Sequence, residues 1–281
     1  MNTKKSHQLL EGKNGLIFGA LDQRSLAWQV AEACHREGAT FTLSNAPIAL
    51  RLGTLQQLAE KTNSELITCD VTDYKEVIKL IRTTVEKTGK LDFLLHAIGM
   101  SPNIRKGIDY QNLNHKLMQQ TLDISAISLH KILQACVDNE ALNENASVVA
   151  LSYIGAQRVF SKYSDMNDAK ALLESIARNF GSRLGKQGIR VNTVSQGPTK
   201  TSAGTGIRGF DAMYDFAQLL SPLGSPSAEE CADYCVTLFS DLTRKVTMQN
   251  LFHDGGFSTN GISEELIFEL AELHASKQSQ Q

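Results

Sequence analysis

Tyr153, Tyr163 and Lys170 are the residues of this chain whose types and spacing best suit catalysis. Tyr163 and Lys170 are seven residues apart, and an Ala-rich stretch follows the lysine. If the segment between them is helical, seven residues rotate by roughly 700°, so both side chains share one face, about 10 Å apart along the axis. A phenol and an ammonium placed in this way can reach opposite ends of one bound ligand. The spacing therefore predicts an active site at Tyr163 and Lys170, with Tyr153 lining it.

The composition is that of an ordinary soluble protein. The chain has 281 residues, of which 42% are hydrophobic and 21% charged, and its formal net charge is -2. Its lysines and arginines are dispersed, so they do not form the basic surface of a nucleic-acid-binding protein. Residues 1–7 lack the apolar stretch of a secretory signal, and no apolar run approaches the ~20 residues that cross a bilayer. We therefore expect a cytoplasmic protein that has neither nucleic acid nor a membrane as partner.

The cysteines are expected to be buried free thiols in a reducing compartment. There are five of them, and they are scattered along the chain. Only Cys231 and Cys235 are spaced to share a helical face, and two thiols without a nearby histidine make a poor zinc site. The sequence therefore predicts no metal site.

Short apolar runs alternate with longer amphipathic stretches along the whole chain. The expected strands are residues 15–19, 40–44, 65–69, 91–97, 146–152, 188–194 and 249–253. The expected helices are residues 25–37, 52–62, 73–88, 113–138, 162–186 and 227–240. Buried strands that alternate with helices favour a parallel sheet covered on both faces. Because crossover connections are right-handed, we expect one Rossmann-type, doubly wound α/β sheet of about seven strands.

We expect one domain over residues 1–281, because no repeat or Pro-rich linker interrupts the pattern. Residues 201–220 combine a glycine-containing first half with an apolar helical face. This segment is expected to be mobile and to close over the substrate, although an ordinary surface helix is the alternative. A C-terminal helical extension is expected at about 262–276.

The turn after the first expected strand is a candidate nucleotide site. In doubly wound sheets the pyrophosphate lies over the helix N-terminus at this point, and Ser25 is a suitable N-cap. Because Gly19 is the one glycine of the usual three-glycine fingerprint, a plain capped turn is the alternative. Asp70 and Val71 follow the third expected strand, and Ile98 follows the fourth. A carboxylate there can accept from an adenine amino group.

Together these segments resemble the short-chain dehydrogenase/reductase family, and within it the bacterial enoyl-acyl-carrier-protein reductases. That branch has Gly-x5-Ser-x-Ala, as in Gly19, Ser25 and Ala27, and Tyr-x6-Lys, as in Tyr163 and Lys170. Further matches are His96-Ala-Ile-Gly-Met-Ser-Pro102, Gly188-Ile-Arg-Val-Asn192, Ser195-Gln-Gly-Pro-Thr-Lys-Thr201 and His253-Asp-Gly-Gly-Phe-Ser258. The resemblance runs from about residue 11 to residue 260.

The resemblance implies a bound nicotinamide cofactor. The implied contacts are Gly19, Ser25 and Leu26 for the pyrophosphate, Asp70 and Val71 for the adenine, Ile98 beneath the cofactor, Lys170 for the ribose, and Thr199, Lys200, Thr201, Ser202 and Ala203 for the carboxamide and the nearby phosphate. The implied substrate contacts are Ser101, Tyr153 and Tyr163. Gln196 and Lys200 depart from the family pattern, which usually has a small residue and an arginine there.

The implied cofactor is NADH, and NADPH is not excluded. Asn45 and Ala46 end the second expected strand without the acidic residue that would bind a ribose diol and repel a 2′-phosphate. Arg51 is close enough in sequence to pair with such a phosphate if the loop folds back.

The activity implied by the resemblance is reduction of trans-2-enoyl thioesters on acyl carrier protein during fatty-acid elongation, by a homotetramer. Hydride delivery to the β-carbon pushes charge onto the thioester oxygen, so a hydrogen-bond donor must already be in place, and Tyr163 is the candidate. Lys170 would bind the ribose hydroxyls, and Tyr153 would line the pocket. The helices at 113–138 and 162–186 are long enough to form a subunit interface.

Two other functions stay open at this point. An ordinary short-chain carbonyl or alcohol dehydrogenase would need a Tyr-x3-Lys pair, and no tyrosine of this chain has a lysine four residues later. A non-catalytic dinucleotide-sensing protein would have little need for Tyr163 and Lys170 together. Of the other polar residues, His96 and His253 are expected to be structural, and Asp165 and Asp168 to be solvated.

Overall fold

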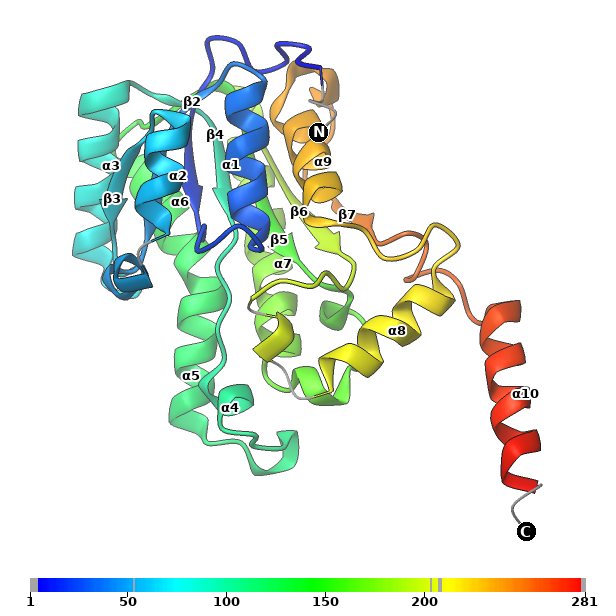
Figure 1. Cartoon of the computed structure of the whole chain (residues 1–281). Helices are drawn as coiled ribbons and strands as arrows, with labels where there is room; N and C mark the ends of the chain where they lie inside the picture. The colour runs from blue at the N-terminus through cyan, green and yellow to red at the C-terminus, as the bar shows by residue number, and fades with distance from the viewer. Residues whose placement is uncertain (1–4, 53, 203, 207–208, 279–281) are drawn as a thin grey trace.

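The computed structural model describes residues 5–52, 54–202, 204–206 and 209–278. Its centre is one seven-stranded parallel sheet in the order β3-β2-β1-β4-β5-β6-β7 (Figure 1). The strands are β1 (Asn14–Phe18), β2 (Thr40–Asn45), β3 (Glu65–Thr68), β4 (Leu91–His96), β5 (Leu142–Ser152), β6 (Arg190–Gln196) and β7 (Asn250–His253). This strand order is that of a doubly wound sheet, which confirms the predicted fold class.

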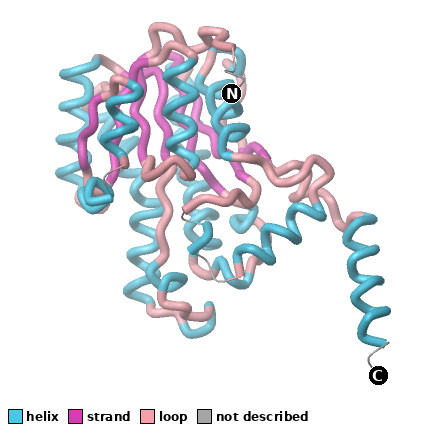
Figure 2. The backbone as a smooth tube through the Cα atoms, in the orientation of Figure 1, coloured by secondary structure: helices cyan, strands magenta, loops and turns pink. Residues whose placement is uncertain are grey.

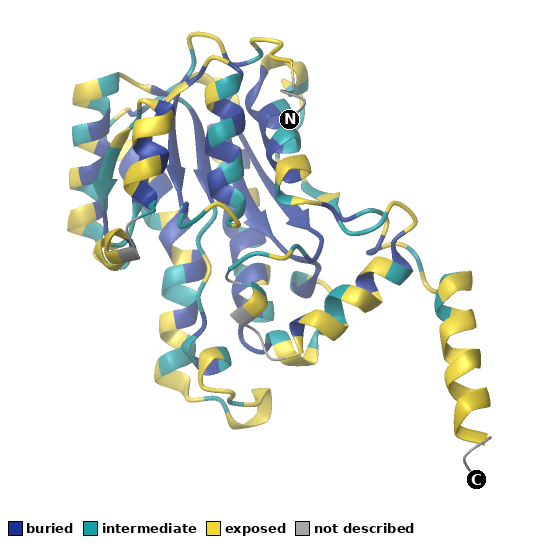
Figure 3. Ribbon diagram, viewed as in Figure 1, coloured by how far each residue is buried: buried dark blue, intermediate teal, exposed yellow. Residues whose placement is uncertain are grey.

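Helices cover both faces of the sheet (Figure 2). The helices of one face are α1 (Leu26–Arg36), α2 (Leu55–Thr62) and α9 (Ala228–Phe239), and those of the other are α3 (Tyr74–Thr88), α6 (Ser128–Asp138) and α7 (Met166–Leu184). Because both faces are covered, the central strands are buried along most of their length, as Figure 3 shows. That double burial is the reason these strands read as nearly continuous apolar runs.

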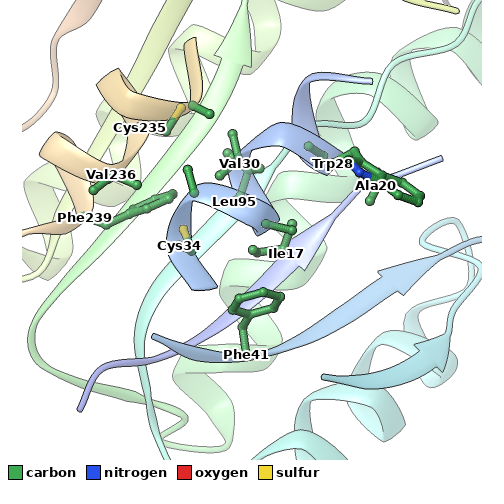
Figure 4. Packing of buried hydrophobic residues seen from close by; sticks show 14 of the residues in the cluster. Ile17, Ala20, Trp28, Val30, Cys34, Phe41, Leu95, Cys235, Val236 and Phe239 are labelled. Carbon is green, nitrogen blue, oxygen red and sulfur yellow. The ribbon is translucent and has the colours of Figure 1, made fainter. Parts of the chain in front are cut away.

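Large side chains fill the space between β1, α1 and α9 (Figure 4). Trp28 is 2% exposed, and its indole N–H donates to Glu32 at 2.7 Å. The rings of Phe93 and Phe239 lie 4.8 Å apart. Burial of one such side chain stabilises the fold by about 1.5–3 kcal/mol. This packing fixes the strand ends from which the candidate site is built.

The long helix expected at 113–138 is interrupted. Helix α5 (His115–Leu122) continues through a π-helical turn, Asp123–Ile127, into α6. Within and beside that turn, Ser125 donates to the carbonyl of Met100, and Ser128 donates to the carbonyl of Ile124. Hydroxyls that bond backbone groups in this way compete with regular helical bonds. Such π turns often mark functional sites, and this one lies against the loop that follows β4.

The remaining helices lie beyond the carboxyl edge of the sheet. Helix α4 (Pro102–Arg105) was not predicted, α8 spans Phe210–Leu220, and α10 spans Glu264–Gln278. Figure 1 shows α10 extending away from the body of the protein, and it has no buried residue. Among the described residues, no helix has both the length and the apolarity that a bilayer crossing needs.

Candidate active site

The candidate cofactor residues lie around the point where the strand order reverses. In a doubly wound sheet, a dinucleotide binds at the carboxyl ends of the strands at this switch point, which here lies between β1 and β4. Gly19 directly follows β1, and Ile98 lies two residues after β4. Tyr153 directly follows β5. The parallel sheet therefore brings these three residues, which are distant in sequence, to one edge.

Gly19 fits a site at which the backbone must be closely approached. Its φ is +97°, and a Cβ added there would lie 2.2 Å from the carbonyl oxygen of Ala97. Only glycine suits both the conformation and the space. The ends of β1 and β4 therefore meet without a side chain between them, as dinucleotide binding at this turn requires.

Ser25 occupies the N-cap position of α1, but its hydroxyl does not cap the helix. The hydroxyl donates to the carbonyl of Asp22 at 2.7 Å and accepts from the N–H of Leu21 at 3.1 Å. The expected capping role is therefore wrong, because the hydroxyl bonds backbone groups of the turn that precedes the helix. The first-turn amides of α1, which begins at Leu26, lack a side-chain cap and can bind an anion such as a pyrophosphate.

At the adenine side, Asp70 is exposed and organises its own turn. Its carboxylate accepts from the N–H and the hydroxyl of Thr72, at 2.9 and 2.7 Å. Val71 beside it is buried. Ile98, which lies in the loop after β4, is partly buried.

The segment after β6 faces the turn after β1. Ser202 donates to the carboxylate of Asp22 at 2.5 Å, which joins the two segments directly. Thr199 donates to the carbonyl of Gly197 and accepts from the side chain of Gln196 at 3.1 Å. Lys200 lies over the ring of Tyr214 on α8, 4.3 Å from its centroid. Thr201 caps a short turn by accepting from the N–H of Gly204, and Ala203 lies outside the described residues.

The structure brings the two candidate tyrosines together. The rings of Tyr153 and Tyr163 lie 4.8 Å apart in an edge-to-face arrangement. Lys170 is buried on α7, and its ammonium donates to the carbonyl of Leu151 at 2.7 Å. A Cβ added at Gly99 would lie 3.8 Å from the Lys170 nitrogen. The lysine therefore lies beside the loop after β4, close to the switch point.

The continuous helix assumed between Tyr163 and Lys170 is wrong. Tyr163 ends a short 3-10 turn, Ser161–Tyr163, and α7 begins only at Met166. Ser164 between them has φ 47° and ψ -134°, outside the helical region. Such a backbone conformation costs about 1–3 kcal/mol in a residue other than glycine. Contacts on both sides of Ser164 hold it, with Tyr163 packed on Tyr153 and the next residue fixed in a buried polar cluster.

That cluster overturns the expectation for Asp165, which is fully buried and not solvated. Its carboxylate accepts from Ser101 at 2.6 Å, Asn103 at 2.8 Å and Thr121 at 2.9 Å. Ser101, the implied substrate contact, is 5% exposed and uses its one hydroxyl hydrogen for Asp165. Asp168 is partly buried, so it too is less solvated than expected, and burial raises the pKa of its carboxyl.

Burial also sets the charge of the catalytic candidates. It raises the pKa of both Tyr153 and Tyr163, so the phenols keep their protons at neutral pH. Burial lowers the pKa of Lys170 to about 8, and the carboxylate of Glu174 partly opposes that shift. A lysine with a pKa of about 8 is predominantly cationic at neutral pH.

His96 and His253 have structural roles, as predicted. His96 is fully buried, its ring hydrogen-bonds Ser128 at 2.8 Å, and burial lowers its pKa to about 3. His253 hydrogen-bonds the side chain of Gln196 at 2.8 Å and stacks on Tyr234. Among the described residues, no group of three or more His, Cys, Asp or Glu side chains is arranged for a metal ion.

An apolar cavity of about 150 Å³ opens beside Tyr163. It lies between the turn at 160–163 and the start of α8, and it is lined by Phe160, Ser161, Lys162, Tyr163, Gly209, Phe210 and Met213. Tyr153 reaches the same region, because its hydroxyl lies 3.7 Å from the sulfur of Met213. Tyr163 therefore lines a small, mainly apolar cavity, and the hydroxyl of Tyr153 contacts one of the residues that line it.

Sequence reasoning missed Asp22, Phe160 and the structural role of Asp165. The side-chain partners of the Asp165 carboxylate are 44 to 64 residues away, and Ser202, which donates to the Asp22 carboxylate, is 180 residues away. No local pattern identifies such pairs. Phe160 is different, because an apolar residue three before Tyr163 in a polar stretch is a visible signal.

The chain is similar in sequence and in fold to known enoyl-acyl-carrier-protein reductases. The family described as "Enoyl-(Acyl carrier protein) reductase" matches residues 19–258. The NADH complex of FabI from Alistipes finegoldii is 53% identical, with a TM-score of 0.91 over 92% of this chain and 93% of that one. The enoyl-[acyl-carrier-protein] reductase [NADH] 2 of Rhizobium meliloti is 36% identical over 89% of this chain and 93% of its own length. The Bacillus cereus reductase, solved with NADP+ and indole naphthyridinone, is 30% identical, with a TM-score of 0.85 over 90% of this chain and 99% of that one. This chain belongs to the enoyl-(acyl carrier protein) reductase family.

Proposed function

We propose that this protein reduces trans-2-enoyl thioesters on acyl carrier protein to saturated acyl thioesters with NADH, the last step of the fatty-acid elongation cycle. The observation that carries the proposal is the Tyr153–Tyr163 pair beside an apolar cavity, with a buried lysine at the cofactor edge. In a member of this family, that arrangement has the parts the reaction needs. NADH, when bound, supplies the hydride.

Tyr163 stabilises the charge that develops on the substrate. As the β-carbon gains hydride, negative charge moves to the thioester oxygen, and the protonated phenol of Tyr163 donates a hydrogen bond to it. A donor that is already in place contributes roughly 3–4 kcal/mol to such a transition state. The apolar lining around Phe210 and Met213 excludes water, which strengthens that interaction.

Tyr153 supports Tyr163 and lines the substrate pocket. Its ring packs edge-to-face on Tyr163, and its hydroxyl points to Met213. Edge-to-face pairs contribute about 0.5–1.5 kcal/mol beyond their burial. We therefore place Tyr153 at the substrate, where it restricts the ring of Tyr163. Ser101 is the third assigned substrate contact; it follows β4 after a short loop, and its hydroxyl donates to Asp165.

Lys170 binds the nicotinamide ribose and keeps the local field positive. Its anchor to Leu151 fixes one of its three N–H donors, which leaves two for ribose hydroxyls. A cation there also favours negative charge on the nearby thioester oxygen. A proton for the α-carbon then comes from solvent or through the ribose and Lys170.

The rest of the cofactor follows the carboxyl edge of the sheet. Gly19, Ser25 and Leu26 hold the pyrophosphate at the start of α1, where the uncapped amides support binding of an anion. The other assigned contacts are Asp70 and Val71 at the adenine, Ile98 beneath the cofactor, and Thr199, Lys200, Thr201, Ser202 and Ala203 at the carboxamide and phosphate.

The end of β2 supports NADH over NADPH. The amide of Asn45 donates to the carbonyl of Ala20 at 2.7 Å, and its oxygen accepts from Ala46. The side chain is therefore committed to the turn. Neither Asn45 nor Ala46 carries a positive charge that could pair with a 2′-phosphate. Arg51 is exposed on the turn Pro47–Leu52, so a direct comparison of the two cofactors tests this preference.

Several larger-scale features belong to the same proposal. Residues 1–281 act as one catalytic domain, with residues 201–220 moving over the acyl chain and about 262–276 forming a C-terminal helical extension. The protein works in the cytoplasm, where acyl carrier protein delivers the substrate. We also propose a homotetramer, in which the surfaces of α5–α6 and α7 meet those of other copies.

The test is consumption of NADH that depends on an added enoyl thioester. Wild-type protein is mixed with NADH or NADPH and with crotonyl thioester, and the near-ultraviolet absorbance of the cofactor is followed. We expect consumption with NADH and thioester together, and none when the thioester is omitted. Consumption that requires a ketone would instead identify a carbonyl reductase. Cofactor binding without any turnover would support the dinucleotide-sensing function.

A further inference from the structure

Asp165 is a buried carboxylate that the reaction described above does not use. It is fully buried, and its two oxygens accept from the side chains of Ser101, Asn103 and Thr121. Among the described residues, no lysine, arginine or histidine forms an ion pair with it. A buried carboxylate is tolerated only when hydrogen-bond donors satisfy it. Here the donors are three neutral side chains.

These donors come from the loop that follows β4 and from α5. Ser101 accepts from the N–H of Ile104 and so caps α4, while Asn103 hydrogen-bonds both backbone groups of Asn114. Thr121 belongs to α5. Figure 1 shows α4 and α5 together beyond the carboxyl edge of the sheet. The carboxylate therefore fastens this whole unit to the segment that carries Tyr163.

The connection to Tyr163 is short and under strain. Asp165 lies two residues after Tyr163, and the residue between them, Ser164, has a positive φ of 47°. A strained turn persists only when both of its sides are held. On one side, Tyr163 packs on Tyr153 and its N–H donates to Phe160. On the other side, Asp165 is the anchor.

We propose that Asp165 is a positioning residue for enoyl reduction, an inference that rests on the proposed function. Its carboxylate holds the strained turn in place, and so it fixes the phenol of Tyr163 against the substrate oxygen. It also holds the start of α4 in place, through Ser101 and Asn103. Asp165 acts through Tyr163 and does not itself contact substrate or cofactor.

The test is Asp165→Asn, which keeps the shape but replaces an accepting oxygen by a donating NH2. Because the donors around residue 165 then face another donor, we expect kcat to fall by about 10- to 100-fold, as for a small misplacement of a catalytic group. The Kd for NADH, measured by fluorescence titration, should change by less than about twofold. Lys170 is held in place by its own hydrogen bond to Leu151, and the other proposed cofactor contacts lie on other segments. The matched control is Asp168→Asn, three residues later in the first turn of α7, and it should keep wild-type kcat.

A double-mutant cycle with Tyr163→Phe separates positioning from general stability. If Asp165 acts through the phenol, Asp165→Asn should lower kcat much less in the Tyr163→Phe background than in the wild type. Equal losses in both backgrounds would overturn the proposal, and so would wild-type kcat in folded Asp165→Asn.

Two milder variants keep the test decisive if Asp165→Asn does not fold. Ser101→Ala and Thr121→Val each remove one donor and leave the carboxylate in place, and each should lower kcat several-fold with an unchanged Kd for NADH. Full kcat in both would overturn the inference. A wild-type protein without enoyl reduction would refute the proposed function instead, so the two failures are distinguishable.

Discussion

The roles proposed for Tyr163 and Lys170 differ, and single substitutions should separate them. Lys170→Ala removes the cation that is proposed to bind the ribose, so we expect NADH affinity to fall by about tenfold or more, together with turnover. Tyr163→Phe removes only the hydroxyl, so NADH binding should be retained while kcat falls by about 10²-fold or more. Fluorescence titration and steady-state kinetics measure both effects. Equal loss of NADH affinity in the two variants would mean that the roles are wrongly assigned.

Lys170 should also set the alkaline limit of activity. Its pKa is lowered to about 8 because burial penalises the cation, so it loses its charge as pH rises through that value. The pKa of Tyr163 is raised by burial, so the phenol does not titrate in the same range. We therefore expect kcat/KM to fall on the alkaline side at about pH 8.

Lys170→Arg is the control for this pH dependence. Arginine stays charged throughout the range, so the variant should be less active overall but should lose the alkaline decline. The same decline in wild type and Lys170→Arg would assign it to another group. Linkage gives a second readout: between pH 8 and 10.5, Lys170 binds its proton more fully in the unfolded chain than in the folded one. Lys170 should therefore make the free energy of unfolding rise with pH in that window.

At the scale of elements, the turn after β1 should tolerate no side chain at Gly19. A Cβ there meets the carbonyl oxygen of Ala97, and φ is +97°. We expect Gly19→Ala to lower the free energy of unfolding by about 1–3 kcal/mol and to weaken NADH binding, because the ends of β1 and β4 must separate. Urea unfolding and NADH titration measure the two effects.

Gly89→Ala is the matched control for Gly19→Ala. Gly89 also has a positive φ, +86°, but a Cβ there has nothing within 4 Å, and the residue precedes β4 at the opposite edge of the sheet. The control should lose stability through backbone strain and keep its NADH affinity. If NADH affinity fell equally in both variants, the turn after β1 would have no special place in cofactor binding.

The elements that the sequence predicted well are those whose pattern is local. The strands were visible because burial on both faces leaves continuous apolar runs, as in Leu91–His96. The sequence does not reveal that the helix begins only at Met166. Ser164 adopts its strained conformation because of contacts on either side of it, and these contacts are not local in sequence. The sequence predicts a solvated Asp165 for the same reason. Its hydrogen-bond partners come from other elements, and its position in a helical pattern does not identify them.

At the scale of the whole molecule, the parallel sheet explains why the site is assembled from five separate stretches of sequence. Every strand ends at the same edge, so the turns after β1, β3, β4, β5 and β6 converge there. The helices α4, α5 and α8 lie beyond that edge (Figure 1). If they form the substrate side, as proposed, variation in these outer helices should change the substrate without altering the cofactor site.

The surface of α5–α6 makes a testable prediction about assembly. Ile127 and Val137 are 38% and 45% exposed, and they lie ten residues apart on one side of the helix, with His130 and Gln134 between them. An exposed apolar pair on a helical surface suits a contact between copies, so we expect a tetramer by light scattering after size-exclusion chromatography. Charges there should dissociate it, so Ile127→Asp with Val137→Asp should give smaller species.

Leu242→Asp is the control for the assembly test, because Leu242 is 71% exposed on the turn Asp241–Thr243, at the opposite edge of the sheet from the candidate site. It should leave the assembly intact, which would show that a new surface charge alone is not disruptive. A monomeric wild type would refute the tetramer. An intact tetramer in the Ile127→Asp/Val137→Asp variant would move the interface to another surface, since a carboxylate cannot be buried between copies without a partner.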